Sequence, residues 1–149
     1  MKISTRVECG IIALIDIAVN SENGRAVSIA GISARQGISA KYLEQILIAL
    51  KQANLIRGQK GSKGGYVLSK EADKINFSEI INALDLTILC DSDPDRDEVQ
   101  EGYKATVNNM LWDKINLYIQ EYTEKIALAD AAARCALTPV GEGEYMYYI

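Results

Sequence analysis

Two short helical segments joined across a single glycine restrict the fold of this chain more than any other feature of its sequence. Ser28 precedes the segment IAGISARQ, and Ser39 precedes a second segment with apolar periodicity. Serine is a preferred residue at helix N-caps. Gly37 stands between the two segments, where a glycine readily takes the left-handed conformation that ends a helix. This punctuation predicts a helix-turn-helix.

The second helix of this pair has two unlike faces. Its apolar residues recur at helical spacing and predict one buried stripe: Leu43, Ile46, Leu47 and Leu50. The other face and the first turn carry hydroxyls, amides, a lysine and hydrocarbon: Ser39, Ala40, Lys41, Tyr42, Gln45, Ile48 and Gln52. In a DNA major groove, glutamine can bond the edge of adenine and hydroxyls can bond bases or phosphates. Considered alone, the helix fits an ordinary neutral surface equally well.

A glycine-rich segment, KGSKGG, follows this helix at residues 60–65. Residues 54–59 and 66–69 are suited to two short strands, and the glycines permit the backbone angles of a tight turn. A helix-turn-helix followed by a hairpin predicts a winged helix, and residues 54–69 are called the wing below. A nucleotide-binding loop is excluded, because no register of the segment supplies the glycine, four residues and Gly-Lys-Ser/Thr of a Walker loop.

The helix pair and the wing together predict a DNA-binding surface. From the helices we expect contacts from Ser28, Ser39, Ala40, Lys41, Tyr42 and Gln45. From the wing we expect Lys60 and Lys63 to lie over phosphates or in a minor groove. Residues 1–70 contain ten Lys or Arg and four acids, whereas residues 71–149 contain six and sixteen, which favours a polyanionic partner for the first half. An enzyme is not expected, because the chain has no histidine and no nucleophile with an identifiable base.

Two further helices are predicted on either side of this unit. Residues 6–19 are apolar most of the way round, so this helix is covered by a second subunit, by the carboxy-terminal segment or by its own domain. A helix from about residue 103 to 122 has apolar residues every three or four positions. We expect it to pair with a second copy of the chain, with folding back onto the first helix as the alternative. The predicted dimerisation residues are Leu111, Ile115, Tyr118, Ile119, Tyr122 and Ile126.

The three cysteines lie far apart, which argues against a disulfide framework; they are Cys9, Cys90 and Cys135. There is no signal-peptide pattern and no apolar stretch of the roughly 20 residues that cross a bilayer, so we expect a cytoplasmic protein. Cys90 lies in an acidic loop whose negative charges disfavour a thiolate, and an inert thiol is favoured over a redox switch. The loop fits calcium poorly, because Arg96 and Gly102 stand where glycine and a bidentate glutamate are needed. No metal site is expected.

Several stretches of the chain resemble the Rrf2 family of bacterial winged-helix regulators. They are the opening MKIST, the stretch RQGISAKYLEQIL, the wing GSKGGYVLSK with INFSEIINALD after it, and Leu111 with Trp112. The resemblance spans nearly the whole chain, and it implies a homodimer that reads a palindromic site with two recognition helices. The ending EYMYYI is most similar to the CymR branch. That branch implies a repressor of cysteine and sulfur metabolism that works with a cysteine-synthesis enzyme.

The resemblance also assigns residues and reveals two departures. It matches Ser39, Tyr42 and Gln45 to DNA contacts, and four further positions to the wing: Gly61, Gly64, Gly65 and Tyr66. Lys60 stands where the family usually has arginine, so the wing is expected to contribute affinity more than base choice. Cluster-binding members hold an iron–sulfur centre with three closely spaced cysteines after the fourth helix. This chain has only Cys90 there, which indicates a member without a cofactor.

The sequence as a whole predicts a mainly α fold with a small β-hairpin. We expect a winged helix-turn-helix domain in residues 1–88, an acidic loop in 89–102, and a long dimerisation helix with a tail in 103–149. The expected function is that of a dimeric, sequence-specific DNA-binding regulator. The alternatives are a family member that senses redox state or stress through a thiol, and a winged-helix module that binds protein and never DNA.

Overall fold

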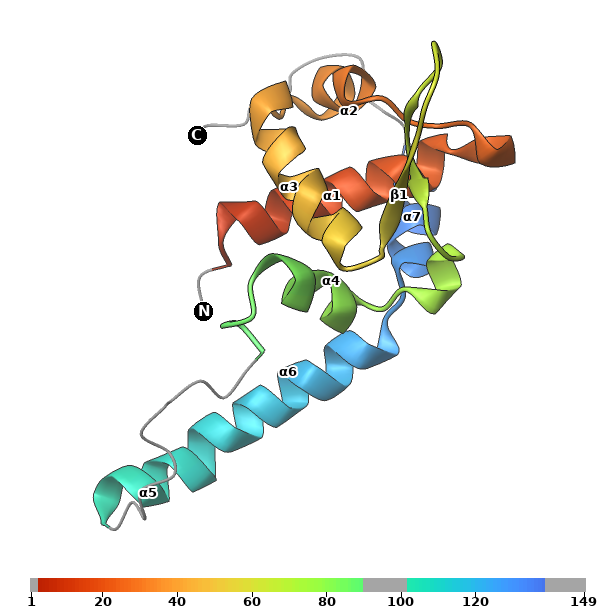
Figure 1. Cartoon of the computed structure of the whole chain (residues 1–149). Coiled ribbons are helices and arrows are strands. Elements are labelled where there is room, and N and C mark those ends of the chain that lie inside the picture. Colours follow the sequence, from red (N-terminus) through yellow and green to blue (C-terminus); the bar gives the residue numbers. More distant parts are fainter. Residues whose placement is uncertain (1–2, 90–101, 139–149) are drawn as a thin grey trace.

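The computed structural model describes residues 3–89 and 102–138 and is mainly helical with one hairpin (Figure 1). Within these residues, no helix is long and apolar enough to span a membrane. The elements, in chain order, are α1 (Thr5–Asn20), η1 (Glu22–Gly24), α2 (Ile29–Gln36), α3 (Ala40–Gln52), β1 (Ile56–Gln59), β2 (Gly65–Leu68), η2 (Ala72–Lys74), α4 (Phe77–Leu84), α5 (Tyr103–Val107), η3 (Asn108–Trp112), α6 (Asp113–Lys125) and α7 (Leu128–Leu137).

The helix-turn-helix forms as its punctuation predicts. The hydroxyl of Ser28 accepts a hydrogen bond from the amide of Gly31 (3.0 Å), and that of Ser39 accepts one from Tyr42 (3.2 Å). Each bond satisfies an amide that the first turn of a helix leaves without a partner. Gly37 ends α2 with φ of 68°, in the left-handed region. The first helix therefore begins and ends, and the second begins, where the sequence predicts.

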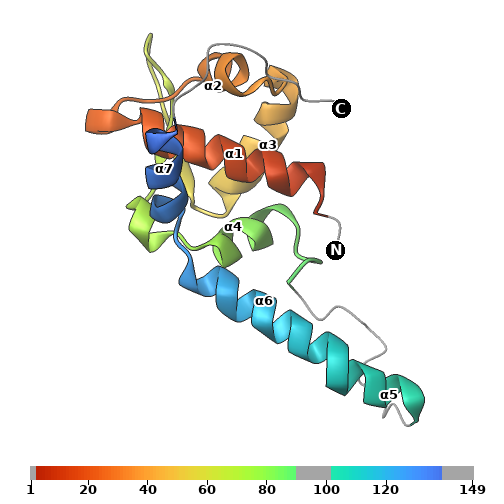
Figure 2. The ribbon, with the colours of Figure 1, turned by 180° about the vertical axis from the view of Figure 1, so that it is seen from behind.

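The core surrounds α1, which lies between α3 on one side and α7 on the other (Figures 1 and 2). The predicted stripe of α3 is fully buried: Leu43, Ile46, Leu47 and Leu50. It shares one cluster with Leu14 and Ile17 of α1. The all-round apolar character of α1 is thus explained by neighbours within the same chain, and one of these neighbours comes from the carboxy-terminal segment.

An ionic network around a buried carboxylate fixes α2 to α1. The carboxylate of Asp16 is fully buried on α1 and accepts two hydrogen bonds from Arg35, from Nη2 (2.7 Å) and Nε (3.0 Å). Gln36 Nε2 donates a third at 2.8 Å. The hydrogen bond to Asp16 raises the pKa of the Arg35 guanidinium above its ordinary value, and the attraction between the charges adds to it. Because a bidentate guanidinium has a fixed geometry, the network sets the orientation of α2 as well as its distance.

The predicted long helix forms a rod that runs from Tyr103 to Lys125 through α5, η3 and α6. It projects away from the winged domain in both views (Figures 1 and 2). The placement of Ile126 on its apolar stripe is wrong. Ile126 is half-buried in extended backbone beyond the helix, where its carbonyl accepts a hydrogen bond from the amide of Phe77 (3.1 Å).

A further helix, α7, was not anticipated by the sequence analysis, which treated residues after the long helix as a tail. The chain turns back after α6, and the amide of Leu128 donates to the carbonyl of Ile75 (2.8 Å). Leu128 is fully buried in the core, and α7 packs along α1. It is therefore α7, and not the long rod, that folds back onto the first helix.

Candidate nucleic-acid interface

The outer face of α3 is exposed along its length. Lys41, Gln45 and Ile48 lie on it at helical spacing, and Gln52 continues it at the carboxyl end. Ser39 and Ala40 are exposed at the amino end, whereas Tyr42 is half-buried and packs against the core. The fully buried stripe lies opposite. This arrangement leaves a protruding helix face with hydrogen-bonding, cationic and apolar groups in one row.

The capping serines of α2 and α3 are both exposed, and both keep a donor. A hydroxyl that accepts a bond from a backbone amide still has its own hydrogen to give. Ser28 and Ser39 each cap a helix whose amino end carries a partial positive charge. Both sites thus suit an anionic oxygen, which is the chemistry expected of phosphate contacts.

The wing is an antiparallel hairpin with Arg57 opposite Val67 and Gln59 opposite Gly65. At its tip, the amide of Gly64 bonds to the carbonyl of Gly61 at 3.0 Å. Of the wing glycines, Gly61 is the one with a positive φ, 122°. Lys60 and Lys63 are exposed beside this turn, as predicted, and carry positive charge at the protruding end of the hairpin.

A close backbone approach joins the wing to the helix-turn-helix. Val27 and Tyr66 exchange two backbone hydrogen bonds, with N–O distances of 2.9 and 2.8 Å, just before α2 begins. A Cβ added at Gly65 would collide with the carbonyl of Val27 and would lie 2.9 Å from the amide nitrogen of Ser28. Gly65 is therefore needed for the space it leaves, and this space lets the wing contact the segment that leads into α2.

Tyr66 is placed differently from the wing lysines. Its side chain is half-buried and packs against the core, and its backbone makes the bonds to Val27. Gly64 is also constrained by space, because an added Cβ would lie 2.8 Å from the carbonyl oxygen of Gln59. Gly64, Gly65 and Tyr66, which are matched to the family, therefore shape the wing itself. Lys60 and Lys63 present charge at its surface.

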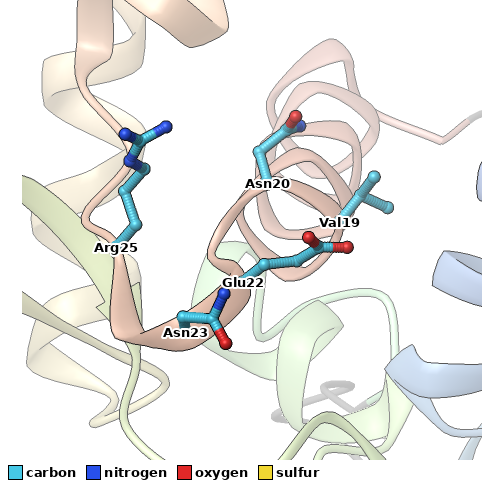
Figure 3. Close-up of a pocket in the computed structure, with 5 residues that line it drawn as sticks. All are labelled: Val19, Asn20, Glu22, Asn23 and Arg25. Carbon is cyan, nitrogen blue, oxygen red and sulfur yellow. The ribbon is translucent and has the colours of Figure 1, made fainter.

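Two exposed arginines were not predicted from the sequence: Arg57 within the wing, on β1, and Arg25 on the segment that leads to α2. Arg25 faces the end of α1 across an open hollow of about 640 Å³ (Figure 3). The hollow is lined by Val19, Asn20, Glu22, Asn23 and Arg25. This lining is largely polar and exposed, unlike the mostly apolar pockets that bury small ligands. The count of basic residues in the first half was the signal that could have identified both arginines.

A second exposed surface follows the rod. Its apolar residues are at least one-third exposed along the whole length: Tyr103, Val107, Met110, Leu111, Trp112, Ile115, Tyr118 and Tyr122. Leu117 is also exposed but lies about 160° around the helix from Ile115. The rings of Tyr118 and Tyr122 stack at 6.3 Å between centroids. Ile119 is half-buried, since the end of α6 packs against α4. Most of the predicted dimerisation residues thus share an uncovered side.

The π-helical turn η3 aligns the two ends of this surface. In a regular α-helix, residues four apart drift by about 40° around the axis, so an i, i+4 pattern spirals away from one face. A π-helical turn contains one more residue than an α-helical turn. This extra residue rotates the residues on either side relative to one another by about 100°, which offsets the accumulated drift. Across η3, Tyr103 and Val107 therefore come round to the side that carries Ile115, Tyr118 and Tyr122. The result is one continuous apolar side along the rod.

The described part of the chain contains two cysteines, one on α1 and one on α7. Cys9 is half-buried on α1, where burial and, secondarily, Glu8 raise the pKa of its thiol. Cys135 is exposed on α7, and Cys90 and the rest of the acidic loop from 90 to 101 lie outside the described residues. Among the described residues, no group of three His, Cys, Asp or Glu is placed to hold a metal ion. Between α4 and the rod the sequence has one cysteine, Cys90, whereas the cluster-binding pattern requires three closely spaced thiolates there.

Comparisons with known proteins agree with this geometry. The model of the Rrf2 family, described as an iron-dependent transcriptional regulator, matches residues 3–134. The chain is 32% identical over 133 residues to the HTH-type transcriptional regulator IscR of Cereibacter sphaeroides, covering 87% of this chain and 86% of the relative.

Two solved structures share the fold. CymR of B. subtilis, titled the global cysteine regulator, has a TM-score of 0.75 and 29% identity, covering 90% of this chain and 98% of its own. IscR of T. potens has a TM-score of 0.74 and 30% identity, covering 99% and 97%. These relatives are regulators of transcription and not enzymes. The predicted fold class is confirmed, and the chain belongs to the Rrf2 family of helix-turn-helix transcriptional regulators.

Proposed function

We propose that the chain acts as a homodimer that binds a palindromic DNA site with two copies of α3 and represses the adjacent promoter. The observation that carries this proposal is the outer face of α3, exposed beside a wing that is hydrogen-bonded to the same helix-turn-helix. In this complex α3 reads bases in the major groove, and the lysines of the wing contact the flanking backbone or minor groove.

The dimer is proposed on the basis of the rod. An exposed apolar side of this length is costly in water, and a second copy is an economical cover, since two-fold dimers are the commonest assembly. Two copies of α3 related by such an axis would meet half-sites about 34–36 Å apart, one helical turn of DNA, or a multiple of that spacing.

The roles of α3 and the wing are separable by mutation. Gln45→Ala is expected to weaken specific binding by about 1–3 kcal/mol with little effect on nonspecific binding, because it removes a contact to a base. Lys63→Ala is expected to weaken both alike, because a phosphate contact has no sequence preference. Both side chains are exposed, so folding should be unaffected. Gel-shift titrations on a selected operator and on random DNA measure both effects. An operator affinity of Gln45→Ala equal to wild type would disprove the assignment.

We propose cysteine and sulfur metabolism as the regulated pathway, and a cysteine-synthesis enzyme as protein partner. The support is the likeness to CymR, whose title names it a cysteine regulator. The tail at 139–149 lies outside the described residues. Sequencing of the genomic fragments that the purified protein retains tests the pathway. Recovery of promoters unrelated to sulfur would reject it.

We also propose that regulation proceeds without an iron–sulfur cluster. The support is the cysteine count, since three thiols in the whole chain are spread over α1, α7 and the acidic loop. Protein purified without oxygen is expected to be colourless, with no cluster absorbance in its visible spectrum. A brown protein whose colour persists after gel filtration would contradict the proposal.

A further inference from the structure

Ile48 is an apolar residue in the middle of the polar face of α3. Its side chain is 57% exposed, whereas the other large aliphatic residues of the helix are fully buried. Single exposed apolar residues are common on protein surfaces, so exposure alone gives Ile48 no role. Its neighbours do, because Ile48 lies one helical turn beyond Gln45 and two beyond Lys41, in the same row.

We propose that Ile48 is a specificity-determining residue that recognises the 5-methyl group of a thymine in the operator. The inference rests on the proposed function, in which α3 enters the major groove. Thymine is distinguished there by a methyl group, whereas the other bases present donors and acceptors that a hydrocarbon side chain cannot bond. Contact with the methyl removes apolar surface of both partners from water.

The position of Ile48 along the helix fits this role. Ile48 lies three positions beyond Gln45, which is about 4.5 Å along the axis of an α-helix. Successive base pairs are about 3.4 Å apart. Ile48 therefore meets a base pair about one step from the one that Gln45 contacts. An adenine read by Gln45 and a thymine read by Ile48 would then form adjacent parts of one half-site.

The inference is tested by replacing single thymines with deoxyuridine, which removes only the methyl group. The operator is first selected with the wild-type protein, and each thymine of one half-site is then replaced in turn. At the contacted position, deoxyuridine is expected to weaken wild-type binding about three- to ten-fold. Ile48→Ala should bind the thymine and uracil operators equally, and Ile48→Val should retain part of the difference. Ile3→Ala is the matched control, because Ile3 is 52% exposed and lies outside α3.

The outcomes separate this inference from the function on which it rests. A wild-type protein that selects no sequence, or a Gln45→Ala variant that binds like wild type, would reject the reading role of α3. Sequence-specific binding in which Ile48→Ala keeps the full response to uracil would reject only the role of Ile48. The same follows if no uracil substitution weakens wild-type binding. Thermal unfolding of each variant confirms that the folded protein is compared in every titration.

Discussion

Gly65→Ala should destabilise the protein and detach the wing. The new methyl group would overlap the carbonyl of Val27, which is backbone and cannot rotate away. Either the chain absorbs the overlap as strain, or the two hydrogen bonds between Val27 and Tyr66 are lost. Overpacking and the loss of backbone bonds together predict a decrease of about 2–4 kcal/mol in the free energy of unfolding. Chemical denaturation measures it directly.

Gly58→Ala is the matched control, since Gly58 lies in the facing strand of the same hairpin. Its added Cβ would meet only the carbonyl oxygen of Gly65 at 4.0 Å, an ordinary contact. The free energy of unfolding should then change by no more than about 0.5–1 kcal/mol, in either direction. Gly65→Ala should bind the operator more weakly than wild type, whereas Gly58→Ala should bind it with wild-type affinity. A Gly65→Ala variant with wild-type stability and affinity would show that the wing does not depend on this approach.

The second large effect is expected from Tyr118→Asp on the rod. Tyr118 is 70% exposed, so the substitution should leave the fold of the protomer intact while it places a charge in the proposed dimer interface. Joining two half-site contacts in one molecule commonly raises affinity by about 10²–10⁴-fold. The variant should therefore be monomeric in analytical ultracentrifugation and bind its palindrome more weakly by a factor in that range.

Gln120→Asp controls for the added charge. Gln120 lies on the same helix about 160° away from Tyr118, where it bonds to Glu124 at 3.1 Å. The Gln120→Asp variant should remain dimeric and bind the operator with an affinity near that of wild type. A Tyr118→Asp variant that remains dimeric would place the interface elsewhere. One that is monomeric but binds the operator with wild-type affinity would reject the palindrome instead.

The parts of the fold that depend on local sequence were predictable. Ser28, Gly37 and Ser39 act within one turn of their own helices, and the stripe on α3 needs only helical periodicity. The exposed position of Lys60 and Lys63 was predictable in the same way, because residues in a glycine-rich turn between two short strands lie at the tip of a hairpin. The candidate DNA-binding face was accordingly located from the sequence, although the roles of its residues stay predictions.

The parts that depend on long-range contacts were not predictable. In the sequence, Asp16 is a charged residue within an otherwise apolar helix. Its partners, Arg35 and Gln36, are nineteen and twenty residues away and contact it only in the folded protein. The return of α7 depends on two backbone bonds, from Leu128 to Ile75 and from Phe77 to Ile126, which no periodic pattern reveals. The requirement for Gly65 was attributed to backbone angles, but it arises from the proximity of Val27.

In the proposed complex, the bonds between Val27 and Tyr66 would also affect which DNA sequences are bound. A flexible basic arm adjusts its path to any minor groove and loses conformational entropy when it binds. A wing tied to the same core as α3 has little such freedom to lose, so the distance between its tip and the reading helix is set before binding. In the proposed complex the duplex must supply the adaptation, and sequences whose groove width or bending already matches that distance bind at lower cost. Base pairs that no side chain touches would then contribute to operator choice.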